Sequence, residues 1–346
     1  MSKGVRERIA EIKNKIKNME QPSIRIAIFG QPGAGKSSLV NSIIGEEQAA
    51  VSVQTDATTK LNTYRHENLV IGDFPGYGTA QFPADNYLER FGVLDYDIFL
   101  CVFNNKLHNA DINFFRQLNK DGRIILLVRT YADGLWQPDK TVQQLQAEIF
   151  TDVCEQLGGR PQLFFVSNID RAGIEELLHS VQAMIEPAKR DAFIRSVRAE
   201  SEQMLAEKYT ASEALITNYC RLAALNGINP IPGLDIALDM SLLFKMFADI
   251  RRIYGLSESR LSKAAAVLPL AKQIMVYGTE WGLMALLKNI GKRVAIGKAI
   301  KYIPLVGQAV AATIGYLIVK KAGLQYLRDC KHLASELLQA ELEKDK

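Results

Sequence analysis

The segment IRIAIFGQPGAGKSS, residues 24–38, decides how the first half of the chain folds. It opens with a β-branched apolar run, which is typical of a buried strand, and it closes with residues that favour a helix. Between them stands the pattern G-x-x-x-x-G-K-[ST], in the strand-loop-helix context that this phosphate-binding motif requires. We therefore predict a loop that wraps the phosphates of a nucleotide. The alternative is a glycine turn that only opens a helix.

Each residue type in this loop suits contact with phosphate. Glycines let backbone N–H groups point inward, and the helix that follows presents the positive end of its dipole. Lys36 would add a full charge near the outer phosphates, and Ser37 would offer its hydroxyl to Mg²⁺. The expected nucleotide-binding residues of the loop are Gly30, Gly33, Ala34, Gly35, Lys36, Ser37 and Ser38.

A second motif, D-x-x-G, runs from Asp73 to Gly76 at the end of an apolar run. In proteins with this kind of phosphate loop, the Asp holds Mg²⁺ through water and the Gly N–H senses the terminal phosphate. Between the two motifs lies QTDATTK, residues 54–60, where Thr58 or Thr59 would reach Mg²⁺ once a triphosphate is bound, and we favour Thr58. A plain turn is the alternative for D-x-x-G. We expect Ser37, Thr58 and Asp73 at the metal, and Lys36, Thr58 and Gly76 at the reacting phosphate.

The residues that follow two later strands are candidates for reading the base. VRTYAD, residues 128–133, places Asp133 where an [NT]-K-x-D motif lets a carboxylate accept two hydrogen bonds from guanine, a donor pattern that adenine lacks. Tyr131 stands where a lysine is usual, so its ring would replace the aliphatic stem that packs on the base. A helix N-cap or turn carboxylate is the alternative for Asp133. The expected base-side residues are Thr130, Asp133, Ser167 and Asn168, the last two in a loop whose N–H groups would meet the guanine oxygen.

The chain divides into an α/β part and a helical part. From residue 24 to about 170, apolar runs alternate with helical stretches, and these runs are IRIAIFG (24–30), NLVIGD (68–73), YDIFLCVF (96–103), RIILLVR (123–129) and QLFFVS (162–167). Such runs are typical of strands buried on both faces, hence of a mostly parallel sheet covered by helices. We predict an α/β P-loop domain over residues 21–185. Residues 1–20 would form an amphipathic helix, and this helix would join residues 186–346 in an all-α domain.

Composition and charge exclude several classes of protein. The chain has 346 residues, of which 48% are hydrophobic and 23% are charged, as is ordinary for a globular protein. Its net charge of +4 comes from basic residues that are spread out, which argues against a nucleic-acid partner. The four cysteines form no C-x-x-C pair, so we expect neither a zinc site nor disulfides, and a reducing cytoplasm fits best. The start of the sequence predicts neither a secretory signal nor myristoylation.

Together these motifs resemble those of the immunity-related GTPases, the interferon-inducible p47 group. The resemblance covers GQPGAGKSSLVNSIIG (30–45), DFPGYGTAQFPADNYLERF (73–91), VRTYAD (128–133) and FFVSNID (164–170). In the helical part it continues with NPIPGLDIALDMSLLFKMFADIRRIYGL (229–256) and IPLVGQAVAATIGYLI (303–318), which ordinary small GTPases lack. The latter pair also resembles the helical domain of some bacterial GTPases. The resemblance implies a Ras-like domain flanked by an N-terminal helix and a C-terminal helical domain.

The resemblance also implies a function. It implies a protein that binds GTP and GDP with Mg²⁺, hydrolyses GTP slowly, self-associates through its nucleotide face and contacts membranes peripherally. Tyr77 stands where Ras-type enzymes carry the glutamine that orients the attacking water. As a substitute the resemblance points to a switch carboxylate, Asp56, acting across a dimer, and a solvated loop carboxylate is the alternative. Two other classes stay open: a nucleotide-stabilised scaffold with negligible hydrolysis, and a P-loop kinase, for which the placement of Asp133 would be a coincidence.

An uncharged stretch from Tyr302 to Val319 touches the lower length limit for a transmembrane helix. Its Pro, Gly, Ala and Thr content favours a helix hairpin buried in a water-soluble domain instead. The basic residues before it would either attract anionic headgroups, at about 1 kcal/mol each, or form a solvated helix face. These residues are Lys288, Lys292, Arg293, Lys298 and Lys301. We expect a cytoplasmic protein with peripheral membrane contact.

Overall fold

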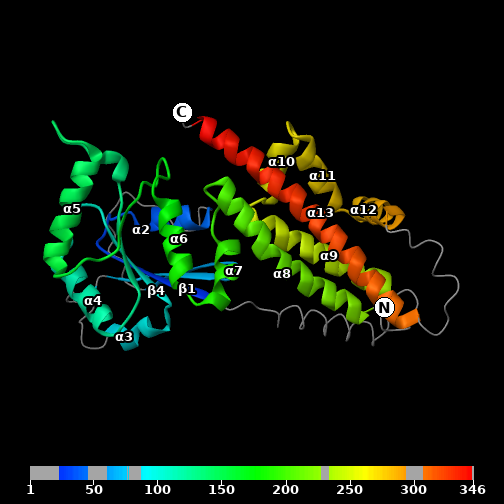
Figure 1. Cartoon of the computed structure of the whole chain (residues 1–346), viewed down its shortest axis with the longest axis horizontal. Helices are drawn as coiled ribbons and strands as arrows, with labels where there is room; N and C mark the ends of the chain where they lie inside the picture. The colour runs from blue at the N-terminus through cyan, green and yellow to red at the C-terminus, as the bar shows by residue number, and fades with distance from the viewer. Residues whose placement is uncertain are drawn as a thin grey trace. The chain divides into compact units, whose positions relative to one another are not determined.

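The computed structural model describes residues 23–45, 61–75, 77, 87–226, 234–293 and 307–344 of the chain (Figure 1). The expected N-terminal helix and the expected site residues Asp56, Thr58 and Gly76 lie outside the described residues. Contacts divide the chain into two compact units, one covering Gln21–Glu200 and the other including Ser201–Lys346. The first is an α/β unit and the second is helical.

In the α/β unit the described strands form one sheet, in the order β2-β3-β1-β4-β5-β6. Their bounds are β1 (Ile24–Phe29), β2 (Asn62–His66), β3 (Leu69–Asp73), β4 (Ile98–Phe103), β5 (Ile125–Arg129) and β6 (Leu163–Phe165). β2 pairs with β3 in antiparallel fashion, and the other pairs are parallel. The mostly parallel sheet is therefore confirmed. β2, an edge strand with half-exposed residues, is not among the runs that the sequence predicts.

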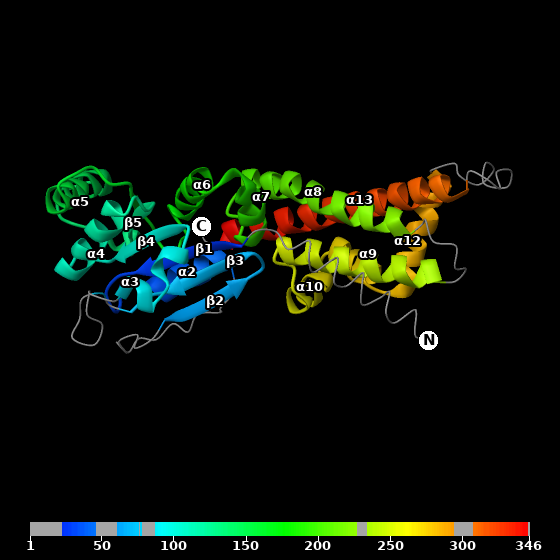
Figure 2. The same cartoon turned by 90° about the horizontal axis from the view of Figure 1, so that it is seen from below.

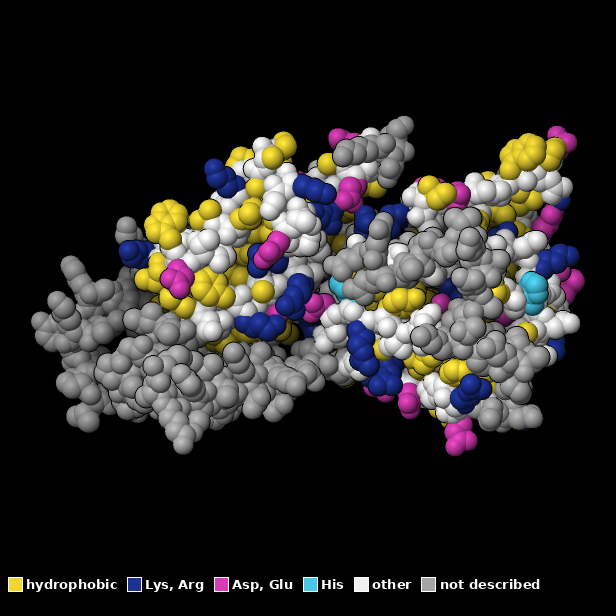
Figure 3. Space-filling view, turned by 180° about the vertical axis from the view of Figure 1, so that it is seen from behind, with side chains coloured by type: hydrophobic (Ala, Val, Ile, Leu, Met, Phe, Trp, Pro, Cys, Tyr) yellow, Lys and Arg dark blue, Asp and Glu magenta, His cyan; other side chains and the backbone are white. Residues whose placement is uncertain are grey.

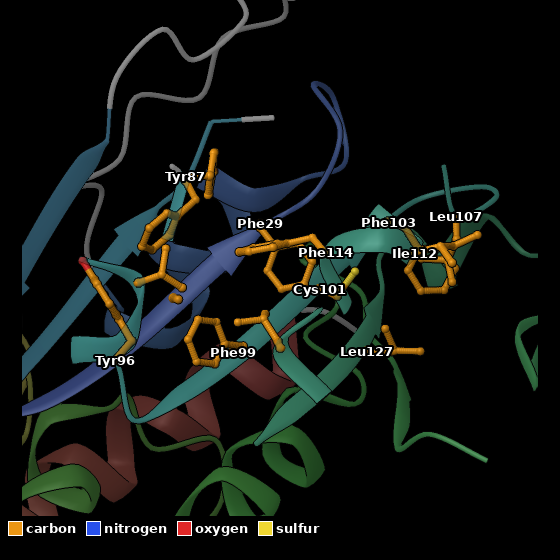
Figure 4. Packing of buried hydrophobic residues seen from close by; sticks show 14 of the residues in the cluster. Phe29, Tyr87, Tyr96, Phe99, Cys101, Phe103, Leu107, Ile112, Phe114 and Leu127 are labelled. Carbon is orange, nitrogen blue, oxygen red and sulfur yellow. The ribbon is translucent and has the colours of Figure 1, made fainter. Parts of the chain in front are cut away.

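Helices cover both faces of this sheet (Figures 1 and 2). Successive strand residues point to opposite faces, and one face carries the side chains of Phe29, Phe99 and Cys101 in a core shared with one group of helices (Figure 4). That group is α3 (Tyr87–Arg90), α4 (Asn109–Lys120) and α5 (Val142–Leu157). The other group is α2 (Lys36–Ile44), α6 (Ile174–Met184) and α7 (Pro187–Ser196), in which α2 contacts β3 and α7 contacts β1 and β3.

The register of the parallel strands positions the segment of residues 24–38. Ile28 of β1 lies beside Asp73 of β3, and Phe29 lies beside Cys101 of β4. The loop after Phe29 therefore starts at the carboxyl edge of the sheet, between the ends of β3 and β4. This edge of an open parallel sheet is where ligands bind.

The α/β unit ends later than the boundary that the sequence predicts at residue 185. α7 lies beyond that boundary and packs on the sheet. Beyond α7, the backbone N–H of Arg198 donates to Ile43 O at 2.8 Å, and Glu200 forms an ion pair with Arg171. Helical periodicity shows which side of a helix is buried but not whether a sheet or another helix covers it, which is why the pattern alone misplaces the boundary.

The second unit is built from helices. They are α8 (Glu202–Asn226), α9 (Leu234–Ile253), α10 (Glu258–Ala265), α11 (Pro269–Tyr277), α12 (Glu280–Arg293) and α13 (Gly307–Lys344). α13 packs along α8 and α9, with Phe247 stacked on Tyr326 at 3.9 Å between ring centroids. The sequence predicts a helix hairpin for the uncharged stretch of residues 302–319. The described part of this stretch, from residue 307 on, belongs to the single helix α13. Within the described residues, no helix combines the length and the apolar content that crossing a bilayer requires.

Candidate nucleotide-binding site

The loop between β1 and α2 has a backbone shape that depends on glycine. Gly30 has φ 143°, and a Cβ placed on it would lie 1.9 Å from Val102 O of the neighbouring strand β4. Gly33 and Gly35 have φ 77° and 85°, in the left-handed region that other residues adopt at a cost. Gly35 also precedes the first residue of α2 as its N-cap. The predicted strand-loop-helix geometry is therefore present.

Three side chains from other elements hold this loop from outside. The Asn104 Nδ2 amide, after β4, donates to Gly33 O at 3.1 Å, and Thr130 Oγ1, after β5, donates to Ala34 O at 2.7 Å. Gln31 Nε2 donates to Asp111 Oδ2 of α4 at 3.1 Å. When carbonyls of a loop are held outward, its N–H groups turn toward the concave side, as in an anion-binding nest.

Asn104 and Asp111 are site residues that sequence reasoning missed. Both follow β4 at the carboxyl edge of the sheet, which is the one sequence signal that points to them. Asp111 is buried, and it also accepts the N–H of His108 at the start of α4. Burial raises the pKa of Asp111, and the Gln31 hydrogen bond opposes that shift.

Lys36 lies at the mouth of the loop with its ammonium group turned back onto the loop. It is 8% exposed, and its Nζ donates to Gly30 O at 3.0 Å and to Gln31 O at 3.1 Å. Burial lowers the pKa of Lys36, while the nearby charges of Asp73 and Asp111 act in the opposite direction. A further anion beside Nζ would favour the charged form of the lysine.

Asp73 ends β3 with a carboxylate that needs a partner. It is 3% exposed, and among the described residues its Oδ1 has no hydrogen-bond partner. Burial raises its pKa, and the charge of Lys36 offsets part of that shift. A buried carboxylate oxygen without a partner is costly unless a cation or donor meets it. With the half-buried Ser37 at the start of α2, it forms an oxygen donor set of the kind Mg²⁺ accepts. The residues present therefore fit that ion.

The loops after β5 and β6 border the phosphate loop on its other side. Tyr131 has φ 56° and is 49% exposed, and Asp133 is exposed in the short 3₁₀ helix η3 (Ala132–Gly134). The N–H of Ala132 donates to Val166 O at 3.1 Å and joins the two loops. Asp133 is therefore exposed, and it lies at the carboxyl edge of the sheet, where the sequence predicts that the base of the nucleotide binds.

Three expected base-side residues have other contacts in the structure. Thr130 is fully buried, and its hydroxyl bonds to Ala34 O and Phe103 O, so it supports the phosphate loop. The N–H of Ser167 is already taken by Ala172 O, and its hydroxyl accepts the N–H groups of residues 169 and 170. The Asn168 side chain accepts Ser42 Oγ of α2 at 3.1 Å. These residues shape the loops, and only the backbone N–H of Asn168 has no described backbone hydrogen bond.

Tyr77, at the position usually held by glutamine, belongs to the aromatic core. Its ring stacks on Phe114 with 4.6 Å between centroids and an interplanar angle of 21°, and it meets the edge of Tyr87 at 5.1 Å. Tyr87 in turn donates its hydroxyl to Pro75 O. Figure 4 shows Tyr87 and Phe114 in this cluster. Tyr77 thus packs against the aromatic cluster at the position where a glutamine is usual.

Comparison with known proteins gives a consistent result. The sequence model of the family described as "Interferon-inducible GTPase (IIGP)" matches residues 2–340. Interferon-inducible GTPase 1 of Mus musculus is 24% identical over 276 residues, which cover 73% of this chain and 66% of that protein. Interferon-inducible GTPase 5 of Bos taurus is 27% identical over 266 residues, which cover 70% of this chain and 56% of that protein. The match thus spans less than two thirds of the length of these relatives.

One solved structure, of a probable GTP-binding protein engB, covers 46% of this chain and 97% of that chain at 18% identity. Its TM-score is 0.35, a likeness too distant to carry an argument about function.

Proposed function

Because the chain belongs to the interferon-inducible GTPase family, we propose that it binds GTP and GDP and hydrolyses GTP to GDP. The observation that supports this most strongly is the pair of buried charges at the mouth of the phosphate loop. Lys36 and Asp73 each shift the pKa of the other toward its charged form. A lysine for phosphate oxygens and a carboxylate for a cation are the two charges that a nucleoside triphosphate with its metal ion requires.

In the proposed complex the phosphate loop binds the triphosphate with little rearrangement. Lys36 Nζ exchanges its bonds to Gly30 O and Gln31 O for phosphate oxygens. The inward N–H groups are preorganised because Asn104 and Thr130 already hold the carbonyls behind them. Preorganised donors cost less ordering entropy on binding. Ser37 and Asp73 would hold Mg²⁺, and that ion when bound supplies positive charge to the outer phosphate oxygens.

We assign guanine preference to Asp133. Its exposed carboxylate can accept two hydrogen bonds from guanine, whereas adenine lacks that donor pair. Tyr131, two residues earlier and half exposed, offers a flat ring to the base in place of the usual lysine stem. The N–H of Asn168 is the donor that we assign to the guanine oxygen.

Hydrolysis by one molecule alone is proposed to be slow, since Tyr77 is packed against Phe114 and the usual water-orienting glutamine is absent. We propose that self-association through the nucleotide face completes the site, with Asp56 as the candidate carboxylate. The second candidate function is a scaffold that assembles on GTP and hardly hydrolyses it. The same packing of Tyr77 favours this alternative.

A dilution series separates these functions. GTPase activity per molecule is expected to rise with protein concentration, and Asp56→Ala is expected to flatten that rise. Activity per molecule that stays constant over a wide range of dilution rules out the dimer mechanism. A single-turnover assay at high protein concentration tests the scaffold, because a scaffold binds GTP without releasing phosphate.

Peripheral membrane contact is proposed for α12. Trp281, which is 77% exposed, Met284 and Lys288 lie at helical spacing on one side of this helix and are exposed. On the face drawn in Figure 3, hydrophobic side chains are exposed beside basic ones. An aromatic side chain beside lysines suits an anionic headgroup layer. Co-sedimentation with anionic vesicles, but not with neutral ones, is the expected result, and Trp281→Ser is expected to weaken it.

A further inference from the structure

A cavity of about 240 Å³ lies in the α/β unit between the loop after β4 and helix α5. Its apolar lining comes from both elements and includes Phe103, Leu107, Ile149 and Val153. Figure 4 shows Phe103 and Leu107 at this end of the core. The volume is below the roughly 300–1,000 Å³ of sites for drug-sized ligands, so the cavity suits a small metabolite.

Arg129, at the end of β5, brings a buried positive charge to this cavity. It is 8% exposed, and its Nη1 donates to Thr130 O. Among the described residues its Nε has no hydrogen-bond partner and the guanidinium forms no ion pair. Burial lowers the pKa of Arg129. A buried charge of this kind normally has an anion beside it.

The two acidic residues that also line the cavity are already engaged elsewhere. Glu148 forms an ion pair with Lys140 at 2.7 Å. Asp152 accepts a hydrogen bond from Gln156 Nε2 at 2.7 Å. Neither forms an ion pair with Arg129, although all three residues line the same space. Arg129 is therefore the buried lining charge for which the described residues provide no counter-group, whereas Lys106, the other basic lining residue, is exposed.

We propose that this cavity binds a small organic monoanion, with its carboxylate against Arg129 and its apolar body against Phe103, Leu107 and Ile149. A guanidinium forms charge-assisted hydrogen bonds to a carboxylate, which offset the burial of its charge. The apolar side chains of the lining favour a ligand with an apolar body over one that consists of charge alone, such as inorganic phosphate. The ligand class is thus an aryl or branched aliphatic carboxylate.

The walls of the cavity are continuous with two of the contacts that hold the phosphate loop. Arg129 directly precedes Thr130, whose hydroxyl bonds to Ala34 O. The cavity-lining loop 105–107 directly follows Asn104, whose amide bonds to Gly33 O. An anion that orders both segments stabilises both contacts and so raises nucleotide affinity. By linkage, bound GDP raises the affinity for the anion by the same factor.

Ligand-observed NMR with benzoate on the purified full chain, without nucleotide, tests binding itself. Benzoate is expected to bind, while benzamide, which lacks the charge, and phosphate, which lacks the apolar body, are expected to bind at least about tenfold more weakly. Arg129→Met removes the charge and Ile149→Trp fills the space, and each is expected to weaken benzoate binding by roughly tenfold. Glu148→Gln is the matched control at the rim and is expected to retain binding.

Several results overturn the proposal. Benzoate that binds no better than benzamide excludes an anion site, and equal binding of phosphate excludes the apolar contact. If Arg129→Met does not fold, Ile149→Trp decides, because unchanged benzoate binding in that variant places the site elsewhere. The coupling is tested separately: benzoate is expected to raise GDP affinity by about fivefold. Benzoate binding without GDP binding contradicts the proposed function alone, so the two failures are distinguishable.

Discussion

The hydroxyl of Thr130 donates to the backbone oxygen of Ala34 at 2.7 Å, across 96 positions of sequence. This bond joins the segment expected to read the base to the loop expected to bind phosphate. Thr130, which the sequence predicts to lie at the base, therefore also supports the loop that is predicted to bind phosphate. The shape of the loop therefore depends on side chains from the ends of β4 and β5 as well as on its own glycines.

Thr130→Val keeps the shape of the side chain and removes its hydroxyl. We expect it to leave Ala34 O without this buried donor, to lower the free energy of unfolding by about 1–3 kcal/mol, and to weaken GDP binding by roughly tenfold. Thr130→Ser retains the hydroxyl and is expected to stay within about threefold of wild type. Calorimetric titration of GDP and chemical denaturation measure both effects. Equal GDP affinity in the Val and Ser variants would show that the bond has no role in binding.

Asn104→Ala removes the amide that holds Gly33 O. Because this bond is solvent-exposed, its loss is expected to weaken nucleotide binding by only about two- to fivefold, with little effect on stability. Asn105→Ala is the matched control, since Asn105 is the adjacent exposed asparagine and its side chain has no hydrogen bond to the loop among the described residues. Stopped-flow release of a fluorescent GDP analogue is expected to be faster for the first variant only. Equal release rates for the two variants would contradict the assignment.

Gly30→Ala and Gly33→Ala form a matched pair in the same loop. At Gly30 the new Cβ would meet Val102 O at 1.9 Å, so we expect a loss of at least about 3 kcal/mol of stability or failure to fold. At Gly33 no atom of the described residues beyond its own chain neighbours lies within 4 Å of the new Cβ, so only the left-handed backbone is penalised, at about 1–2 kcal/mol. Thermal unfolding without nucleotide measures the difference. Similar midpoints for the two variants would mean that the loop relaxes away from β4.

Asp73→Asn is expected to stabilise the nucleotide-free chain at neutral pH. Burial raises the folded-state pKa of Asp73, so between the ordinary pKa of an aspartate and this raised pKa the folded state binds more protons than the unfolded state. The stability of the wild type therefore falls as pH rises through the folded-state pKa, and the Asn variant lacks that fall. The same change is expected to abolish the Mg²⁺ dependence of GTP binding. Lower stability of Asp73→Asn at pH 7 contradicts this account of the buried charge.

Tyr77→Gln restores the residue type that usually orients the attacking water. We expect no more than about a threefold change in the GTPase rate of dilute protein, because position 77 faces the aromatic core. Loss of the stacked ring on Phe114 is expected to lower the free energy of unfolding by about 1–3 kcal/mol. A large increase in the rate of dilute protein would show that the side chain at 77 reaches the nucleotide.

The sheet could be predicted from sequence because its central strands are buried on both faces and so form continuous apolar runs, as in FLCVF of β4. β2 could not, because NTYRH at the sheet edge is half exposed and lacks such a run. The Gly30 to Ser37 loop was predictable because phosphate binding demands glycines, a lysine and a hydroxyl at fixed spacing. The central strands and the phosphate loop can be predicted because each depends on the types of consecutive residues.

Contacts between distant segments could not be predicted in the same way. Asn104 and Asp111 have no motif, and their roles follow from the register that brings the end of β4 beside the phosphate loop. Thr130 and Ser167 were assigned to the base because of their position in a motif, but only the structure shows their hydroxyls bonded to backbone groups. The packing of Tyr77 on Phe114 likewise depends on α4 lying over β1, which no single segment encodes.

The proposed guanine nucleotide site is tested by titration of GTP, GDP and ATP against the wild type, Lys36→Ala and Asp133→Asn. We expect the wild type to bind GTP and GDP and to prefer them to ATP by roughly a hundredfold or more. We expect Lys36→Ala to lose affinity for every triphosphate, and Asp133→Asn to lose only the preference for guanine. Equal affinity of the wild type for ATP and GTP would contradict the assignment of Asp133, and no heat with any nucleotide would contradict the site as a whole.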